Sequence, residues 1–143
     1  MTPKKEPQTL KDQLFRAFPN VLFEQTEEKL VFGSIFIIPD DESGLESRSR
    51  RKGRTHEHPF VVIKYDRMTT KIVTCAIRTT NPQAHGMRTP ANLLPRLDKE
   101  GIIATKRPWP LDAQVFVGGE YLGRLPEPFL SQLRDLLRLE GWM

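Results

Sequence analysis

The stretch from His58 to Thr80, HPFVVIKYDRMTTKIVTCAIRTT, decides the fold of this chain. It holds two apolar runs, Phe60–Ile63 and Ile72–Ile77, on either side of a short polar connection. Both runs are rich in β-branched residues and are too short for buried helices, so they predict two strands. The Thr-rich connection from Asp66 to Thr70 predicts a hairpin or a tight loop between them.

The outer ends of this hairpin carry the polar residues best suited to chemistry. The triplet His56–His58 precedes the first run, and the triplet Arg78–Thr80 follows the second. Antiparallel pairing would bring the two triplets together. A general base, a cation and hydroxyl groups would then share one edge of the sheet, and we take this edge as the candidate site.

Further short strands with turn signals between them are expected along the chain. The segments Asp40–Glu57 and Asn81–Pro95 are expected to be loops, the second with a brief pairing at Leu93 and Leu94. The proline-bound segment Lys106–Leu111 is expected to be extended. Strands are expected at Ser34–Ile38, Gly101–Thr105 and Ala113–Val117, with a hairpin-type turn at Gly118–Gly119 and Glu120–Leu125 following it.

Apolar residues at helical spacing predict one helix near each end of the chain. The first is Leu10–Phe18, which Pro19 and Asn20 should end, with a strand or an extended arm at Val21–Phe23. The second follows Pro126 and should end near Gly141. Its apolar face comprises Phe129, Leu130, Leu133, Leu136 and Leu137.

This order of elements predicts a mainly β protein with helices, of the α+β class. A small twisted sheet would close into a partial barrel, with helices packed at its ends. We expect residues 1–29 to form an N-terminal tail and a short helix, and residues 30–143 to form the barrel domain.

Composition points to a cytoplasmic protein with an anionic partner. The 143-residue chain has a net charge of +4, which favours nucleic acid or an acidic protein as a partner. No apolar run approaches the roughly 20 residues that span a bilayer, and no apolar segment follows Lys4 and Lys5 as in a secretory signal. The single cysteine, Cys75, lies in an apolar run and is expected to be a reduced core residue.

Basic residues gather in one polar stretch, SRSRRKGRT, and at three later positions. Such a stretch is either a solvated segment or an arm that binds phosphates and becomes ordered on binding. Trp109, beside Lys106 and Arg107, either stacks on an unpaired base or plugs one end of the core. The candidate RNA-binding residues are Arg48, Arg50, Arg51, Lys52, Arg54, Arg88, Lys106 and Arg107.

Five segments, in order over roughly residues 30 to 140, match the pattern of one protein family: Phe32–Ile38, Gly44–Glu46, His58–Ile63, Ala76–Thr79 and Leu122–Leu125. In these segments the chain resembles the MazF/PemK/Kid family of toxins from bacterial toxin–antitoxin pairs. The resemblance implies an SH3-like barrel at residues 30–143, with a C-terminal helix and an added N-terminal helix. It also implies a ribosome-independent endoribonuclease, a homodimer, and a protein antitoxin that covers the active groove.

The chain departs from the family pattern at the catalytic positions. His58 stands where the family has an arginine before the proline, and the family's threonine falls at Arg78 or Thr79. Cleavage of single-stranded RNA without a metal or another cofactor needs a base, an acid and a cation for the phosphate. His58 or His56 suits the role of base or acid, Arg78 can clamp the phosphate, and Thr79 can donate a hydrogen bond.

Two other functions fit the same residues. One is a non-catalytic module that binds nucleic acid or protein on the same fold, and the other is a topoisomerase poison, which a related toxin family exemplifies. A zinc site is not expected, because the chain has three histidines and no CxxC or HExxH motif. Hydrogen bonds from His58 to Arg78 and Thr79 in an open groove would favour catalysis, whereas packing of His58 under the basic stretch would favour binding.

Overall fold

The computed structural model describes residues 19–44, 57–78 and 85–142 of the chain. In this part of the chain, an antiparallel seven-stranded sheet has the order β4-β5-β3-β2-β1-β7, and β6 pairs with β3. The strands are β1 (Ser34–Pro39), β2 (Glu57–Asp66), β3 (Lys71–Arg78), β4 (Met87–Thr89), β5 (Gly101–Ile103), β6 (Trp109–Asp112) and β7 (Glu120–Arg124). The helices are α2 (Pro19–Glu27), α3 (Asp40–Ser43), α4 (Ala113–Val117) and α5 (Phe129–Leu139).

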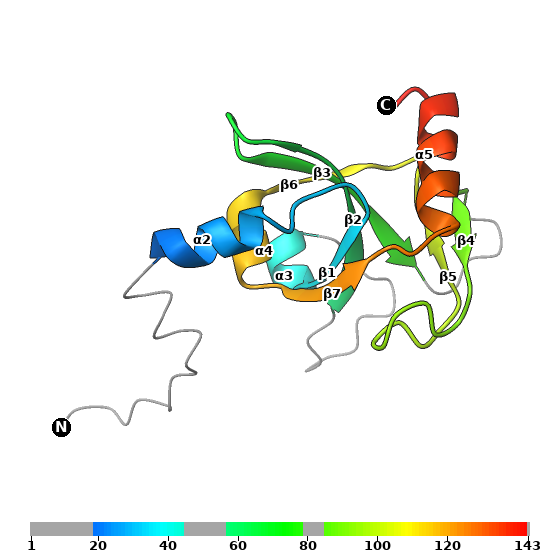
Figure 1. Cartoon of the computed structure of the whole chain (residues 1–143), viewed down its shortest axis with the longest axis horizontal. Helices are drawn as coiled ribbons and strands as arrows, with labels where there is room; N and C mark the ends of the chain where they lie inside the picture. The colour runs from blue at the N-terminus through cyan, green and yellow to red at the C-terminus, as the bar shows by residue number, and fades with distance from the viewer. Residues whose placement is uncertain (1–18, 45–56, 79–84, 143) are drawn as a thin grey trace.

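The expected central hairpin is formed by β2 and β3. These strands pair from Phe60–Ala76 to Asp66–Lys71, with a register shift between Val62 and Lys64. At its other end β3 leaves β2 and pairs with β5, and along its first half it pairs with β6. The sheet therefore curls around β3 into a half-barrel, as the sequence predicts (Figure 1).

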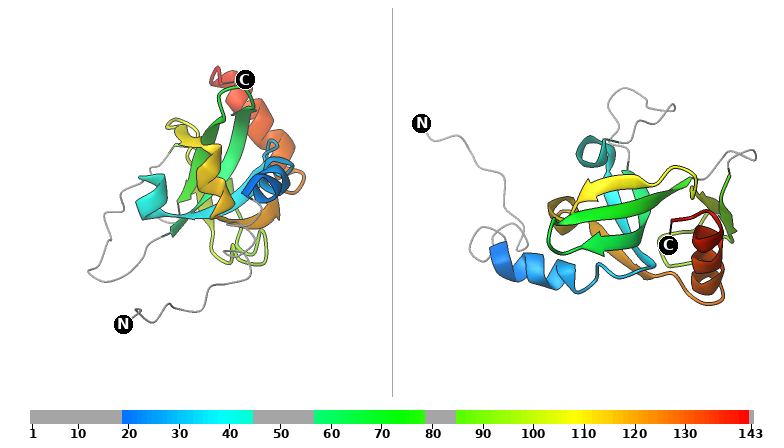
Figure 2. Two further views of the ribbon diagram at one scale, coloured as in Figure 1. Left: turned by 90° about the vertical axis from the view of Figure 1, so that its left-hand side faces the viewer. Right: turned by 90° about the horizontal axis from the view of Figure 1, so that it is seen from above.

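The two faces of the curled sheet bury two separate core clusters. The first lies against α4 and includes Phe36, Phe60 and Phe116. The rings of Phe36 and Phe116 meet edge to face with centroids 5.0 Å apart, a favoured aromatic geometry. The second lies beneath α5 and includes Val61 and Ile103. Helices α2 and α5 lie at opposite ends of the molecule (Figures 1 and 2).

The C-terminal helix α5 confirms the amphipathic pattern read from the sequence. Leu130, Leu133 and Leu137 are buried in the second cluster. Beyond the last turn, Gly141 has a φ of +83°, and its N–H donates to the carbonyl of Arg138 at 3.1 Å. The next N–H donates to Leu137 at 2.9 Å. These two bonds satisfy carbonyls that a helix end leaves open, which is why glycine ends α5.

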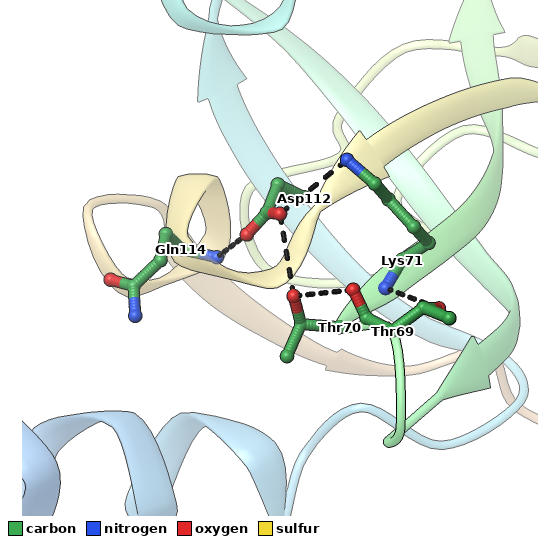
Figure 3. A network of polar contacts seen from close by, with 5 residues as sticks. All are labelled: Thr69, Thr70, Lys71, Asp112 and Gln114. Carbon is green, nitrogen blue, oxygen red and sulfur yellow. Dashed lines mark hydrogen bonds and ion pairs between the residues drawn. The ribbon is translucent and has the colours of Figure 1, made fainter.

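The prediction of a strand at Ala113–Val117 is wrong, because this segment forms the helix α4. The Asp112 carboxylate caps the helix by accepting from the backbone N–H of Gln114 at 3.0 Å. The same carboxylate accepts from Thr70 at 3.4 Å and pairs with Lys71 at 3.6 Å (Figure 3). The backbone hydrogen bond, followed by the charge of Lys71, lowers the pKa of Asp112. A cap held by the β2–β3 turn thus outweighs the β propensity of the segment, and Gly118–Gly119 follows a helix instead of joining two strands.

The N-terminal expectation is also partly wrong. Val21–Phe23 lies inside α2 instead of forming a strand or an extended arm, and Pro19 belongs to the same helix. Proline is compatible with the first turn of a helix, where its missing N–H has no partner to lose. Phe23 packs against the first core cluster. The expected helix Leu10–Phe18 lies outside the described residues.

Three short elements occupy segments that were expected to be loops or merely extended. Asp40–Ser43 is the short helix α3 within the expected loop 40–57, and acidic residues in its first turn favour a helix start. Strand β4 lies within the expected loop 81–95, and its Met87 faces Ile103. Strand β6 tolerates Pro110 while pairing with β3. The expected pairing near Leu94 is present as a bridge to Leu97.

Helix α2 is tied to the hairpin through Glu27, and this contact depends on pH. The hydroxyl of Tyr65 donates to Glu27 at 2.5 Å, and Arg67 pairs with the same carboxylate at 3.2 Å. Burial, then the hydrogen bond and charge of Glu27, raise the pKa of Tyr65 from 10.0 to about 12. The neutral phenol makes the bond, so its contribution is complete below pH 10 and disappears as the pH rises through 12.

We therefore expect the stability of the protein to fall between pH 10 and about 12 by an amount that Tyr65→Phe removes. The measurement is urea unfolding at several alkaline pH values, together with the tyrosinate absorbance. Tyr121→Phe is the matched control, because it removes the only other tyrosine hydroxyl. An identical alkaline loss of stability in the Tyr65→Phe and wild-type proteins would show that this contact does not hold α2.

Candidate functional site

His58 lies near the start of β2 and is held by a buried carboxylate. Its backbone is opposite Ile38 of β1, which places its side chain on the face of the first core cluster. The side chain is 19% exposed, and its Nδ1 lies 2.6 Å from Oδ1 of Asp40. Asp40 begins α3 directly after β1 and is 6% exposed. The pairing of β1 with β2 therefore brings the two side chains together.

The imidazole of His58 is anchored on one side only. An ionised carboxylate only accepts hydrogen bonds, so Nδ1 carries the proton in the contact with Asp40. No other described residue makes a hydrogen bond to Nε2 of His58. The second oxygen of Asp40, Oδ2, is buried and has no partner among the described residues. The arrangement leaves Nε2 available to a ligand or a substrate.

Two arginines share one face at the same end of the sheet. Arg78 is opposite Ile102, and Ile102 is opposite Arg88, so the three side chains lie on one face. Neighbouring strands are about 4.8 Å apart, which puts the backbones of the two arginines about 10 Å from each other. Both side chains are exposed, and neither forms an ion pair with a described acidic residue. They are available to phosphates.

His58 and Arg78 occupy matching places at the ends of β2 and β3. Pairing of these strands ends at Phe60–Ala76, and both residues lie two positions beyond that pair. Side chains alternate along a strand, so both lie on the face that carries Phe60 and Ala76. Because β3 turns away to β5 here, no hydrogen bond joins His58 to Arg78 in the described part of the chain. The hydrogen bond found at His58 is to Asp40 instead.

The remaining candidate residues are dispersed or lie outside the described chain. Lys106 and Arg107 are exposed in the turn between β5 and β6, away from any described ion pair. Trp109 is half-buried against the first core cluster, and its indole N–H donates to the Ser43 carbonyl at 2.8 Å. Trp109 therefore plugs one end of the core, which was one of the two alternatives predicted for it. The candidates outside the described residues are His56, Thr79, Arg48, Arg50, Arg51, Lys52 and Arg54.

Sequence reasoning missed Asp40. Asp40 was expected only to begin the loop Asp40–Glu57. Partnership with His58 follows from the β1–β2 register, in which Ile38 faces His58 across 20 positions of sequence. The local signal that was present is the run of acidic residues after Pro39 that starts α3.

Cys75 has no part in this site. It is fully buried in the second core cluster, as expected. Burial, with a smaller effect from the charge of Glu140, raises the pKa of its thiol to about 12. The nucleophilic thiolate is therefore suppressed at neutral pH.

Two further observations concern metals and membranes. Within residues 19–44, 57–78 and 85–142, no three His, Cys, Asp or Glu side chains gather at a point where they would hold a metal ion. None of the described helices combines the length and apolar character needed to cross a bilayer.

Comparison with known proteins relates the chain to one fold. No protein-family model matches the sequence, and no curated protein is similar to it in sequence. The structure is similar to a chain in the crystal structure of MazE-MazF (Form-II) from Deinococcus radiodurans, with a TM-score of 0.51 and 16% identity. The match covers 78% of this chain and 95% of that chain. This chain therefore has the MazF-like fold that its sequence motifs predict.

Proposed function

We propose that this chain is the toxin of a toxin–antitoxin pair and cleaves single-stranded RNA without a metal ion. One observation carries the proposal: an imidazole whose Nε2 has no described partner and two arginines without a described ion pair lie on one face at one end of a MazF-like sheet. A base beside phosphate-binding cations is the equipment that this reaction requires.

The proposed reaction uses the 2′-hydroxyl of the RNA as the nucleophile. Nε2 of His58 takes the 2′-hydroxyl proton, the O2′–P bond forms, and the P–O5′ bond breaks. The products are a 2′,3′-cyclic phosphate and a 5′-hydroxyl, whose oxygen receives a proton from the same imidazole or from water. Arg78 binds the phosphate oxygens, and Thr79 donates a further hydrogen bond to them. Imidazole titrates near neutrality, so it suits proton transfer better than the arginine of the family pattern.

The RNA strand would extend from this centre over the other basic residues. Arg88 lies on the same face as Arg78, and Lys106 and Arg107 are exposed. Phosphates are also proposed to bind a basic stretch that lies outside the described residues and contains Arg48, Arg50, Arg51, Lys52 and Arg54. An acidic antitoxin would cover the same cations, because its carboxylates compete with phosphate for arginine. We propose that the active form is a cytoplasmic homodimer, by analogy with the toxin family that the chain resembles.

The proposal predicts cleavage of a mixed-sequence RNA in excess EDTA, with 2′,3′-cyclic phosphate or 3′-phosphate ends. Arg78→Ala should reduce the rate about a hundredfold, the usual effect of losing one preorganised donor. The measurement is single-turnover cleavage with analysis of the product ends. Arg138→Ala is the control, because Arg138 is exposed on α5 with no described ion pair. Full activity of the Arg78→Ala protein would remove this residue from the site, and cleavage abolished by EDTA would contradict metal-free chemistry.

A non-catalytic binding module is the second candidate, and the small exposure of His58 favours it. With 19% of its side chain exposed and Nδ1 engaged by Asp40, His58 also fits a purely structural role. The same assay separates the two functions. RNA that is bound in a salt-dependent manner through Arg78 and Arg88, but never cleaved by the wild-type protein, would identify a binding module.

A further inference from the structure

We infer that Asp40 is the positioning residue of His58: it fixes the proton on Nδ1 and the orientation of the ring, so that Nε2 meets the RNA. The inference rests on the proposed ribonuclease function and adds a residue that the family resemblance does not supply. Two observations support it: the short contact between His58 and Asp40, and the burial of an Asp40 oxygen that has no described partner.

The geometry is that of a short, partly buried hydrogen bond. Nδ1 of His58 and Oδ1 of Asp40 are 2.6 Å apart. Asp40 is 6% exposed, whereas its helix neighbours Asp41 and Glu42 are exposed. Glu57, beside His58 in the chain, is exposed and pairs with Arg96 at 3.5 Å. Among these described acids, Asp40 is therefore the one that acts on His58.

The buried carboxylate is costly as a purely structural device. Oδ2 of Asp40 is buried without a described partner, and an unsatisfied buried polar atom lowers stability. An apolar residue of similar size at the start of α3 would not carry that cost. A buried group that opposes stability while holding a titratable side chain is typical of functional sites.

The pair gives His58 a defined role in proton transfer. With the proton on Nδ1, Nε2 carries the lone pair and accepts the 2′-hydroxyl proton. The imidazolium formed in this step is stabilised by the negative charge of Asp40 on its other side. The proton that Asp40 holds on Nδ1 does not move, which is the arrangement that works in carboxylate–histidine pairs of other enzymes.

Asp40→Asn tests the inference, because it keeps the size of the side chain and replaces an acceptor with a group that also donates. The amide NH₂ of the variant can donate to Nδ1, which moves the ring proton to Nε2 and removes the base. We expect kcat to fall by about 10²- to 10⁴-fold and the KM for RNA to change little. Nitrogen NMR of the full chain at about pH 8.5, above the usual imidazole value, should show the proton on Nδ1 in the wild type and on Nε2 in the variant.

Asp41→Asn is the matched control, with the same chemical change one residue away on the exposed side of α3. It should leave kcat and the tautomer unchanged. A wild-type tautomer with the proton on Nε2 would overturn the inference without any variant, even if Asp40→Asn fails to fold. Unchanged kcat in a folded Asp40→Asn protein would overturn it as well. The Nδ1–H tautomer in a protein that cleaves no RNA would refute the proposed function alone.

Discussion

Replacing His58 with alanine should reduce RNA cleavage by about 10²- to 10⁴-fold, the range that a positioned acid or base contributes. The change removes the Nε2 lone pair that we propose to take the 2′-hydroxyl proton. Arg78 and Arg88 remain on their face of the sheet, so RNA should bind with the same salt dependence. The measurement is single-turnover cleavage together with binding at several salt concentrations.

His85→Ala is the control for this prediction. His85 is a second histidine within the described chain, and it pairs with Glu140 at the end of α5 instead of with Asp40. Its replacement should leave cleavage unchanged. Because His58→Ala also takes away the described partner of Asp40, the melting temperature has to be recorded for both variants. A folded His58→Ala protein that cleaves RNA at the wild-type rate would exclude His58 as the base.

Leu133→Ala should lower the free energy of unfolding by about 2–5 kcal/mol, the usual cost of a cavity left by a leucine. Leu133 is 0% exposed and lies in the second core cluster, between α5 and the sheet. A helix of this length is marginal in isolation, so its packing on the sheet must hold it in place. The measurement is urea unfolding, in which the midpoint should fall.

The same helix offers a matched control. Leu139→Ala makes the same chemical change at a side chain that is 86% exposed, and surface changes of this kind usually alter stability by less than about 0.5 kcal/mol. Equal stability of the Leu133→Ala and Leu139→Ala proteins would show that the apolar face of α5 contributes nothing to the core.

The sequence predicted the elements whose own residues determine them. The β2–β3 hairpin follows from two β-branched runs around a polar turn, and α5 follows from a long apolar face with Gly141 at its end. Helix α4 was missed because a five-residue segment is too short to show a helical period. Its capping carboxylate, Asp112, is also contacted by Thr70 and Lys71 from far away in the sequence. The three-residue strand β4 is defined by its pairing with β5, which no local pattern reveals.

The candidate site could be predicted only in part, for the same reason. His58 and Arg78 were predicted as site residues because a hairpin brings its own ends together. Asp40 was not found, because its contact with His58 requires the pairing of β1 with β2. Arg88 was recognised as a cation, but its alignment with Arg78 depends on a strand order that places β5 between β3 and β4.

The position of β3 has a consequence for how the protein opens. Its side chains enter both core clusters, with Ile72 in the first and Ile77 in the second, and it pairs with β2, β5 and β6. Detaching this strand would expose both clusters at once, so we expect its amide hydrogens to exchange with solvent only through global unfolding, and those of β4, which ends the described strand order, to exchange through local opening. On this expectation, partial opening would leave the strand of Arg78 in place and release the strand of Arg88.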